Sequence, residues 1–269
     1  MLVAAVDTAT LALSCALVEI SAGSPPRLRC DRTEHLGADK GSKAGRRELP
    51  AAPGVGAARS THSARLPQAL VDLLTAEGLG IPDLDAYAVG LGPGSFTGLR
   101  IGLATWKGLA YANRKPIAGA SSLAAMALAA AADADEGAVV VPLLDARKGE
   151  VYAGFYRVTS GGVVELAADA ALPPPALAAR VAELAAAGAR PQVFGGVIEA
   201  YAADLADVPR LDTDVATPPA FAVAALVAER LAGASYDANA LFALEPHYVR
   251  ASEAELKFPK GLGPGADRT

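Results

Sequence analysis

The sequence predicts an α/β fold in which one unit of mixed β-sheet and flanking helices occurs twice, so that two similar domains form. The main observation is a repeated pattern of strand, aspartate, turn and strand. The pattern surrounds Asp7 within residues 1–20 and Asp145 within residues 139–158. The second observation is length, because 269 residues suffice for two domains that each contain a hydrophobic core.

The domain boundary is expected near Lys115. Residues 1–115 then form the first domain, and residues 116–258 form the second, with a C-terminal helix that packs back toward the first. Residues 37–59 carry mixed charges, glycine and proline without lasting periodicity, which predicts a flexible surface insertion. Residues 259–269 have no apolar face to bury and are expected to form a disordered tail.

The first domain contains two predicted helices, each with apolar residues at helical spacing. One begins near His62, and its apolar face consists of Leu66, Leu70, Leu73 and Leu74. The other begins near Thr97, and its apolar stripe consists of Leu99, Leu103, Trp106 and Ala110. In the second domain, Ser121 and Ser122 are expected to cap an alanine-rich helix that starts at about Leu123.

A glycine-rich segment, residues 90–102, joins a predicted buried strand to the second of these helices. Its sequence is GLGPGSFTGLRIG, which we interpret as a turn followed by a helix that Ser95 or Thr97 caps. Gly98 and Gly102 lie four residues apart on one helix face. Because neither carries a side chain, another segment can pack closely against that face.

A phosphate site is the alternative interpretation of the same segment, because amide groups at a helix N-terminus attract anions. A P-loop, however, ends in Gly-Lys-Ser/Thr, whereas Gly98 is followed by Leu99 and Arg100. A dinucleotide-binding loop needs a third glycine where this chain has Ser95. The residues therefore favour a tight turn and a closely packed helix.

Together with three other segments, the glycine-rich segment resembles the TsaB (YeaZ) family. The other segments are VDTAT at residues 6–10, LDARKGEVY at residues 144–152 and EPHYVR at residues 245–250. They occur in the family's order and span most of the chain. The resemblance implies a duplicated actin-like (ASKHA, ribonuclease H-like) fold. It also implies a non-catalytic role in the synthesis of threonylcarbamoyladenosine at the position 3′ of the anticodon in tRNA.

The resemblance further implies protein partners. The helices that begin near His62 and Thr97 would dock onto the same helix pair of TsaD, the catalytic paralogue, or onto a second copy of the chain when TsaD is absent. A TsaE-like ATPase would be a third member, ATP or ADP would bind elsewhere in the assembly, and tRNA would be reached indirectly. The candidate interface residues are Leu66, Leu70, Gly98, Gly102 and Trp106. The alternative is that both helices only cover the sheet.

The resemblance also implies a vestigial nucleotide cleft. Its candidate positions are Asp7, Thr8, Asp145, Gly195 and Gly196. Actin-like ATPases use the corresponding acids to hold magnesium and need glycine-rich turns beside them. Here Asp7 precedes Thr-Ala-Thr and Asp145 precedes Ala-Arg-Lys, so we expect both aspartates to cap turns. The alternative is an active ATPase or phosphotransferase that uses the same residues.

Metal-dependent and nucleophilic hydrolysis are both disfavoured. The three histidines, His35, His62 and His247, are dispersed, and Leu66 stands where a helical metal motif would have its second histidine. The sequence has no Gly-x-Ser-x-Gly elbow and no Ser-x-x-Lys motif. We therefore expect no catalytic residue, no metal ligand and no intrinsic cofactor.

Composition excludes further classes. A net charge of −5 gives the chain no overall field that would attract nucleic acid. Its two cysteines, Cys15 and Cys30, and the lack of a secretory signal predict a reducing cytoplasm. The alanine-rich apolar runs are well short of the ~20 residues that span a bilayer, so no membrane contact is predicted.

Overall fold

The computed structural model describes residues 1–36 and 62–250. The predicted insertion at residues 37–59 and the predicted tail at residues 259–269 lie outside the described residues. In the part of the chain that the structure describes, no helix is both long enough and apolar enough to cross a membrane.

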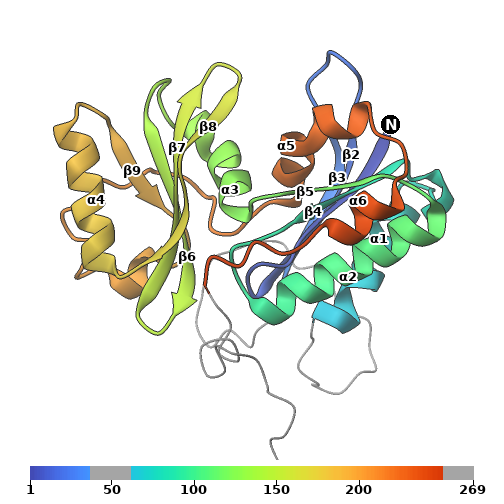
Figure 1. Ribbon diagram of the computed structural model, residues 1–269, viewed down its shortest axis with the longest axis horizontal. Helices are drawn as coiled ribbons and strands as arrows, with labels where there is room; N and C mark the ends of the chain where they lie inside the picture. Colours follow the sequence, from blue (N-terminus) through green and yellow to red (C-terminus); the bar gives the residue numbers. More distant parts are fainter. Residues whose placement is uncertain (37–61, 251–269) are drawn as a thin grey trace, which may run out of the picture.

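The first domain is built on a five-stranded mixed sheet with the strand order β3-β2-β1-β4-β5 (Figure 1). Strands β1, β2 and β3 form an antiparallel meander, and β1, β4 and β5 run parallel. Parallel neighbours need a crossover, which the helices α1 and α2 supply. The bounds are Leu2–Asp7 (β1), Ala12–Glu19 (β2), Arg27–His35 (β3), Ala86–Gly90 (β4), Ile117–Ala120 (β5), His62–Ala76 (α1) and Phe96–Asn113 (α2).

Both faces of this sheet are buried. Side chains alternate along a strand, so Val6 faces α1 and α2 whereas Ala5 faces the other side. That other side is covered by α5, Ala220–Ala232, with α3, Ser122–Ala130, beside it. The strands are therefore apolar on both faces, as their sequences require.

The second domain repeats this plan with a four-stranded sheet of order β8-β7-β6-β9. Strands β6, β7 and β8 form an antiparallel meander, and β9 runs parallel to β6. Helix α3 covers one face and α4 the other. The bounds are Val139–Arg147 (β6), Glu150–Thr159 (β7), Gly162–Leu172 (β8), Pro191–Phe194 (β9) and Pro174–Ala186 (α4).

The predicted duplication is confirmed. The hairpins β1–β2 and β6–β7 carry Asp7 and Asp145 near equivalent ends of their first strands. In each domain the meander is followed by a strand that pairs in parallel with the meander's first strand. The mixed sheets and flanking helices are thus two copies of one α/β unit, as the sequence predicts.

The domain boundary differs from the expected one. Strand β5 lies beyond Lys115 but pairs with β4, so the first sheet extends to Ala120. Helix α5 packs on that sheet, and α6, Ala238–Ala243, packs on α2. The first domain therefore contains residues 1–120 and the segment from Ala220 onward, and Figure 1 shows these late helices on the first lobe.

The helix predicted at Leu123 is present as α3. Ser121 is its N-cap, and its hydroxyl oxygen accepts hydrogen bonds from the amides of Leu123 and Ala124. Helix α2 is capped by Ser95, whose hydroxyl oxygen accepts from the Gly98 amide at 3.2 Å. Of the two caps that the sequence left open for this helix, Ser95 is the one used.

Candidate functional site

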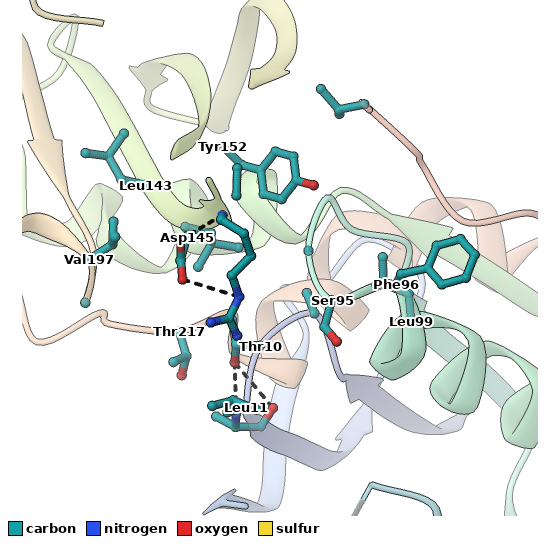
Figure 2. Close-up of a pocket in the computed structure, with 18 of the residues that line it drawn as sticks. Thr10, Leu11, Ser95, Phe96, Leu99, Leu143, Asp145, Tyr152, Val197 and Thr217 are labelled. Atoms are coloured by element: carbon teal, nitrogen blue, oxygen red, sulfur yellow. Dashed lines mark hydrogen bonds and ion pairs between the residues drawn. The ribbon is translucent and has the colours of Figure 1, made fainter. Parts of the chain in front are cut away.

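A cleft of about 1060 Å³ lies between the two domains (Figure 2). One wall is formed by the β1–β2 turn and the N-terminal end of α2, and the other by the β6–β7 turn and the segment after β9. The residues that Figure 2 labels along it are Thr10, Leu11, Ser95, Phe96, Leu99, Leu143, Asp145, Tyr152, Val197 and Thr217.

Asp7 is withdrawn from this cleft. Its side chain is buried, and both carboxylate oxygens are occupied. Oδ1 accepts a hydrogen bond from the Ala9 amide at 2.8 Å, and Oδ2 accepts one from the Ser122 hydroxyl at 2.6 Å. Burial raises the pKa of Asp7 to about 6, although both hydrogen bonds act in the opposite direction. Asp7 therefore caps a turn and ties it to the start of α3.

Asp145 lines the cleft but also caps its turn. Oδ1 accepts a hydrogen bond from the Arg147 amide at 2.8 Å, and Oδ2 lies 3.5 Å from the Arg147 guanidinium (Figure 2). Arg147 and Lys148 both have a left-handed backbone, with φ of 63° and 55°. The turn that would offer amides to a phosphate thus holds two long cationic side chains instead.

The glycine-rich segment packs around the β1–β2 turn. A Cβ atom at Gly98 would overlap the Thr8 carbonyl oxygen, and one at Gly102 would overlap Thr8 Oγ1. A Cβ atom at Gly94 would lie 2.6 Å from that of Ala9. The Ser95 amide also donates to the Ala9 carbonyl at 2.6 Å. These glycines are required because the turn lies directly against the helix.

This packing corrects the assignment of interface residues. The segment that packs closely against Gly98 and Gly102 is Thr8 of the same chain, and not a partner. Leu66, Leu70 and Trp106 are at most 1% exposed and form the core between the first sheet and its helices. Their burial follows from their position on the apolar faces of α1 and α2. A partner would have to contact the opposite faces.

The two glycines after β9 have different surroundings. Gly195 has φ of 130°, and a Cβ there would overlap the Leu143 carbonyl oxygen, so this position needs glycine for backbone packing. Gly196 lines the cleft, and its amide donates to the Ala216 carbonyl at 3.2 Å. Of the five candidate cleft positions, only Asp145 and Gly196 therefore face the cleft, while Asp7 and Thr8 lie behind it.

These residues do not fit a magnesium nucleotide of the kind that actin-like ATPases bind. Magnesium prefers exposed carboxylate oxygens, but the Asp7 carboxylate is buried and bonded at both oxygens. Asp145 is engaged by Arg147, whose cationic group would repel the metal. Both aspartates of the repeated turns are therefore engaged as turn caps.

The chain resembles proteins of known family in both sequence and structure. The tRNA threonylcarbamoyladenosine biosynthesis protein TsaB of Escherichia coli (strain K12) is 41% identical over 103 residues, which are 38% of this chain and 44% of the relative. The protein of the same name from Bacillus subtilis (strain 168) is 35% identical over 111 residues, 41% of this chain and 47% of the relative. The match to the solved structure of YeaZ from Pseudomonas aeruginosa covers 92% of this chain and 99% of YeaZ, with a TM-score of 0.64 and 26% identity.

A family model decides the assignment. Described as TsaD: tRNA N6-adenosine threonylcarbamoyltransferase, it matches residues 55–258. The chain belongs to this family, in its TsaB (YeaZ) group. The matched segments span less than half of the length of these curated TsaB relatives. The matches also identify the duplicated α/β architecture as the actin-like (ASKHA, ribonuclease H-like) fold.

The histidines of this TsaB-family chain lie in different surroundings. His62 is 8% exposed in α1, and burial lowers its pKa below the usual value. His35 and His247 line the cleft. Among residues 1–36 and 62–250, no group of three or more His, Cys, Asp or Glu side chains is arranged to hold a metal ion.

The outer faces of α1 and α2 carry exposed residues that were not among the predicted interface residues. Ala104, Gly108 and Ala112 are exposed at intervals of four residues along α2, and Val71 of α1 is 44% exposed. A Cβ at Gly108 would have no neighbour within 4 Å. A glycine inside a helix costs about 1 kcal/mol relative to alanine, and at Gly108 no contact within the described chain requires it. In the sequence, a glycine in the interior of a predicted helix was the feature that could have indicated this exposed surface.

Proposed function

We propose that this chain is the non-catalytic partner subunit in the transfer of threonylcarbamoyl to N6 of the adenosine 3′ of the anticodon in tRNA. In this role it binds and activates a TsaD-like catalytic subunit. The names of its TsaB relatives support the biosynthetic role. The observation that carries the non-catalytic part is Asp7, a carboxyl that the corresponding enzymes would need in the open cleft and that this chain uses inside its core.

The docking surface of the proposal consists of the exposed faces of α1 and α2, which we call the docking face: Val71, Ala104, Gly108 and Ala112. Helices α1 and α2 contact each other, so their outer faces form one continuous surface. Small residues at intervals of four allow a partner helix to approach closely. The occupant is a TsaD-like paralogue, or a second copy of the chain when that paralogue is absent.

The complete assembly includes a TsaE-like ATPase, which would hold ATP or ADP outside this chain. The tRNA substrate is modified by the TsaD-like subunit in the cytoplasm. The second interpretation is an active ATPase or phosphotransferase. No contact in the described cleft favours it, because Asp7 and Asp145 both cap turns.

The docking face can be tested with two matched glycine variants. Gly108→Leu places a bulky side chain on the docking face, whereas Gly161→Leu places the same side chain at an open position in the second domain. Binding to the TsaD-like subunit of the same organism would be measured by isothermal titration calorimetry. We expect Gly108→Leu to weaken binding at least tenfold and Gly161→Leu to leave it unchanged, with thermal unfolding as the check on folding. Equal affinities for both variants would contradict the proposed docking face.

A further inference from the structure

Exposed aromatic side chains gather along one side of α2. Aromatic residues make up only 5% of the chain. Among the described residues, four are more than 40% exposed: Phe96, Tyr111, Phe242 and Tyr248. Phe96 begins α2 and Tyr111 lies in its last turn, about 22 Å further along at 1.5 Å per residue. Phe242 and Tyr248 come from the C-terminal segment that runs along the same helix (Figure 1).

The aromatic rings form two pairs, one near each end of the helix. The ring centroids of Phe96 and Tyr248 are 5.2 Å apart, and those of Tyr111 and Phe242 are 5.7 Å apart. A groove of about 420 Å³ lies between α2 and the C-terminal segment and is lined by Phe242 and Tyr248. The rings of each pair support each other, and the Arg100 guanidinium lies over the Phe96 ring, so Tyr111 and Phe242 are the more exposed of the four.

Two cationic side chains stand between the ring pairs. The Arg100 guanidinium lies 3.8 Å from the Phe96 ring centroid, and its Nε donates to the Tyr248 hydroxyl at 2.9 Å. Lys107 Nζ donates to the carbonyl oxygens of Phe242 and Leu244. These acceptors are neutral. Within residues 1–36 and 62–250, no carboxylate forms an ion pair with either cation.

Basic residues outnumber acidic ones around these two cations, although Glu245 lines the groove and Lys115 is paired with Asp85. From residue 86 to residue 132 the chain has four basic residues and no acidic one. Several arginines elsewhere in the same domain have acidic partners, as in the pairs of Arg32 with Asp72 and of Arg65 with Glu34. A chain of net charge −5 therefore carries a local cationic strip, and this strip coincides with the exposed rings.

We propose that this strip binds single-stranded RNA directly. We call it the aromatic row: Phe96, Arg100, Lys107, Tyr111, Phe242 and Tyr248. Exposed rings stack on unpaired bases, and neighbouring cations neutralise phosphates, which is how single strands are held without sequence readout. A base paired within a duplex does not present its face, so a duplex has no equivalent contact. An acidic protein segment would use the cations but would leave the ring faces without a matching partner.

This inference goes beyond the proposed function, in which tRNA is reached through another subunit. The aromatic row and the docking face are adjacent on α2 and meet at Ala104, which lines the groove, whereas Gly108 does not. Gly108→Leu should therefore weaken binding of the TsaD-like subunit and leave RNA binding by the isolated chain intact. The docking of the TsaD-like subunit and the binding of RNA can therefore be refuted separately.

The test is fluorescence anisotropy of a labelled RNA of about ten nucleotides, single-stranded or annealed to its complement, with the full chain as titrant. We expect the single strand to bind more tightly than the duplex. Tyr111→Ala and Phe242→Ala should each reduce the affinity about tenfold, because each removes a stacking face. Arg100→Gln should reduce the slope of log K against log salt by about 0.7.

Two variants serve as controls. Val164→Ala removes another exposed apolar side chain on β8, and Arg190→Gln removes an exposed arginine of the second domain. Both should bind RNA like the unaltered chain. Equal binding of duplex and single strand, or unchanged affinity of the aromatic variants, would overturn the proposal. Loss of TsaD-like subunit binding in those variants without loss of RNA binding would assign the aromatic row to a protein contact instead.

Discussion

Replacing Asp7 by asparagine should stabilise the protein at neutral pH. The folded-state pKa of Asp7 is raised to about 6 by burial, above its ordinary value of 3.8. Ionisation of Asp7 therefore opposes folding. The contribution of Asp7 to the unfolding free energy is therefore greatest below pH 3.8, where the carboxyl is neutral. It is lost as the pH rises through 6 and the buried carboxyl ionises. An asparagine remains neutral at every pH and keeps an oxygen that can accept from the Ala9 amide.

The size of the effect follows from the two pKa values. Their difference corresponds to about 3 kcal/mol once the pH is well above 6. The gap in unfolding free energy between Asp7→Asn and the unaltered chain should thus be small near pH 4 and should grow toward about 3 kcal/mol at pH 7 to 8. The amide Nδ2 can donate to the Ser122 hydroxyl oxygen, so the link between the turn and α3 is retained.

Urea denaturation at a series of pH values measures this gap. Asp145→Asn is the matched control, because it removes an exposed carboxylate from the equivalent turn of the second domain, and its gap should stay within about 0.5 kcal/mol. A constant gap for Asp7→Asn would mean that burial does not raise the pKa of Asp7. A destabilisation that grows with pH would refute the reasoning, because it would mean that the fold favours an ionised Asp7, as a metal-binding cleft requires.

Four further substitutions probe the packing and capping of the same helices and can be checked by urea or thermal unfolding. Gly102→Ala should lower the unfolding free energy by about 1–3 kcal/mol, because a methyl group has no room there. Gly108→Ala should raise it by up to about 1 kcal/mol; equal effects at the two glycines would contradict this packing. Trp106→Phe should cost about 1–3 kcal/mol by leaving the buried Ala4 carbonyl without its 2.9 Å hydrogen bond; a neutral result would show that this bond is replaced. Ser121→Ala should cost about 1–2 kcal/mol through loss of the α3 N-cap, and an unchanged melting temperature would contradict that role.

The duplicated fold could be predicted because its signals are local. Each hairpin consists of consecutive residues, with an apolar strand on each side of a turn that an aspartate caps. The caps Ser95 and Ser121 were also recognisable, because N-capping uses a side chain within three residues of its acceptor amide. Such features depend little on the rest of the chain.

Strand β3 was not expected, because its side chains are charged and exposed. It is held at the sheet edge by backbone pairing with β2 and by ion pairs such as Arg29 with Glu77 and Arg32 with Asp72. These partners lie 40 or more residues away in sequence. Strand β5 was assigned to the wrong domain for a similar reason, since its parallel pairing with β4 spans helix α2.

The site was only partly predictable. The spacing of Gly98 and Gly102 correctly indicated a close approach, but spacing does not say what approaches. The neighbour is Thr8, 90 residues away from Gly98, so an internal contact was interpreted as a partner contact. Of the three glycines of α2, Gly108 is the one at which an added Cβ would meet no atom of the described chain within 4 Å.

The most direct test of the account is to quantify threonylcarbamoyladenosine in tRNA by mass spectrometry after a reconstituted reaction. The mixture contains a TsaD-like subunit, a TsaE-like ATPase and the threonylcarbamoyl adenylate, with or without this chain. We predict that modification requires the chain and that Asp7→Asn and Asp145→Asn variants support it as well as the unaltered chain. Modification that proceeds equally without the chain, or that is abolished by either aspartate variant while the protein remains folded, would contradict the role of a non-catalytic partner.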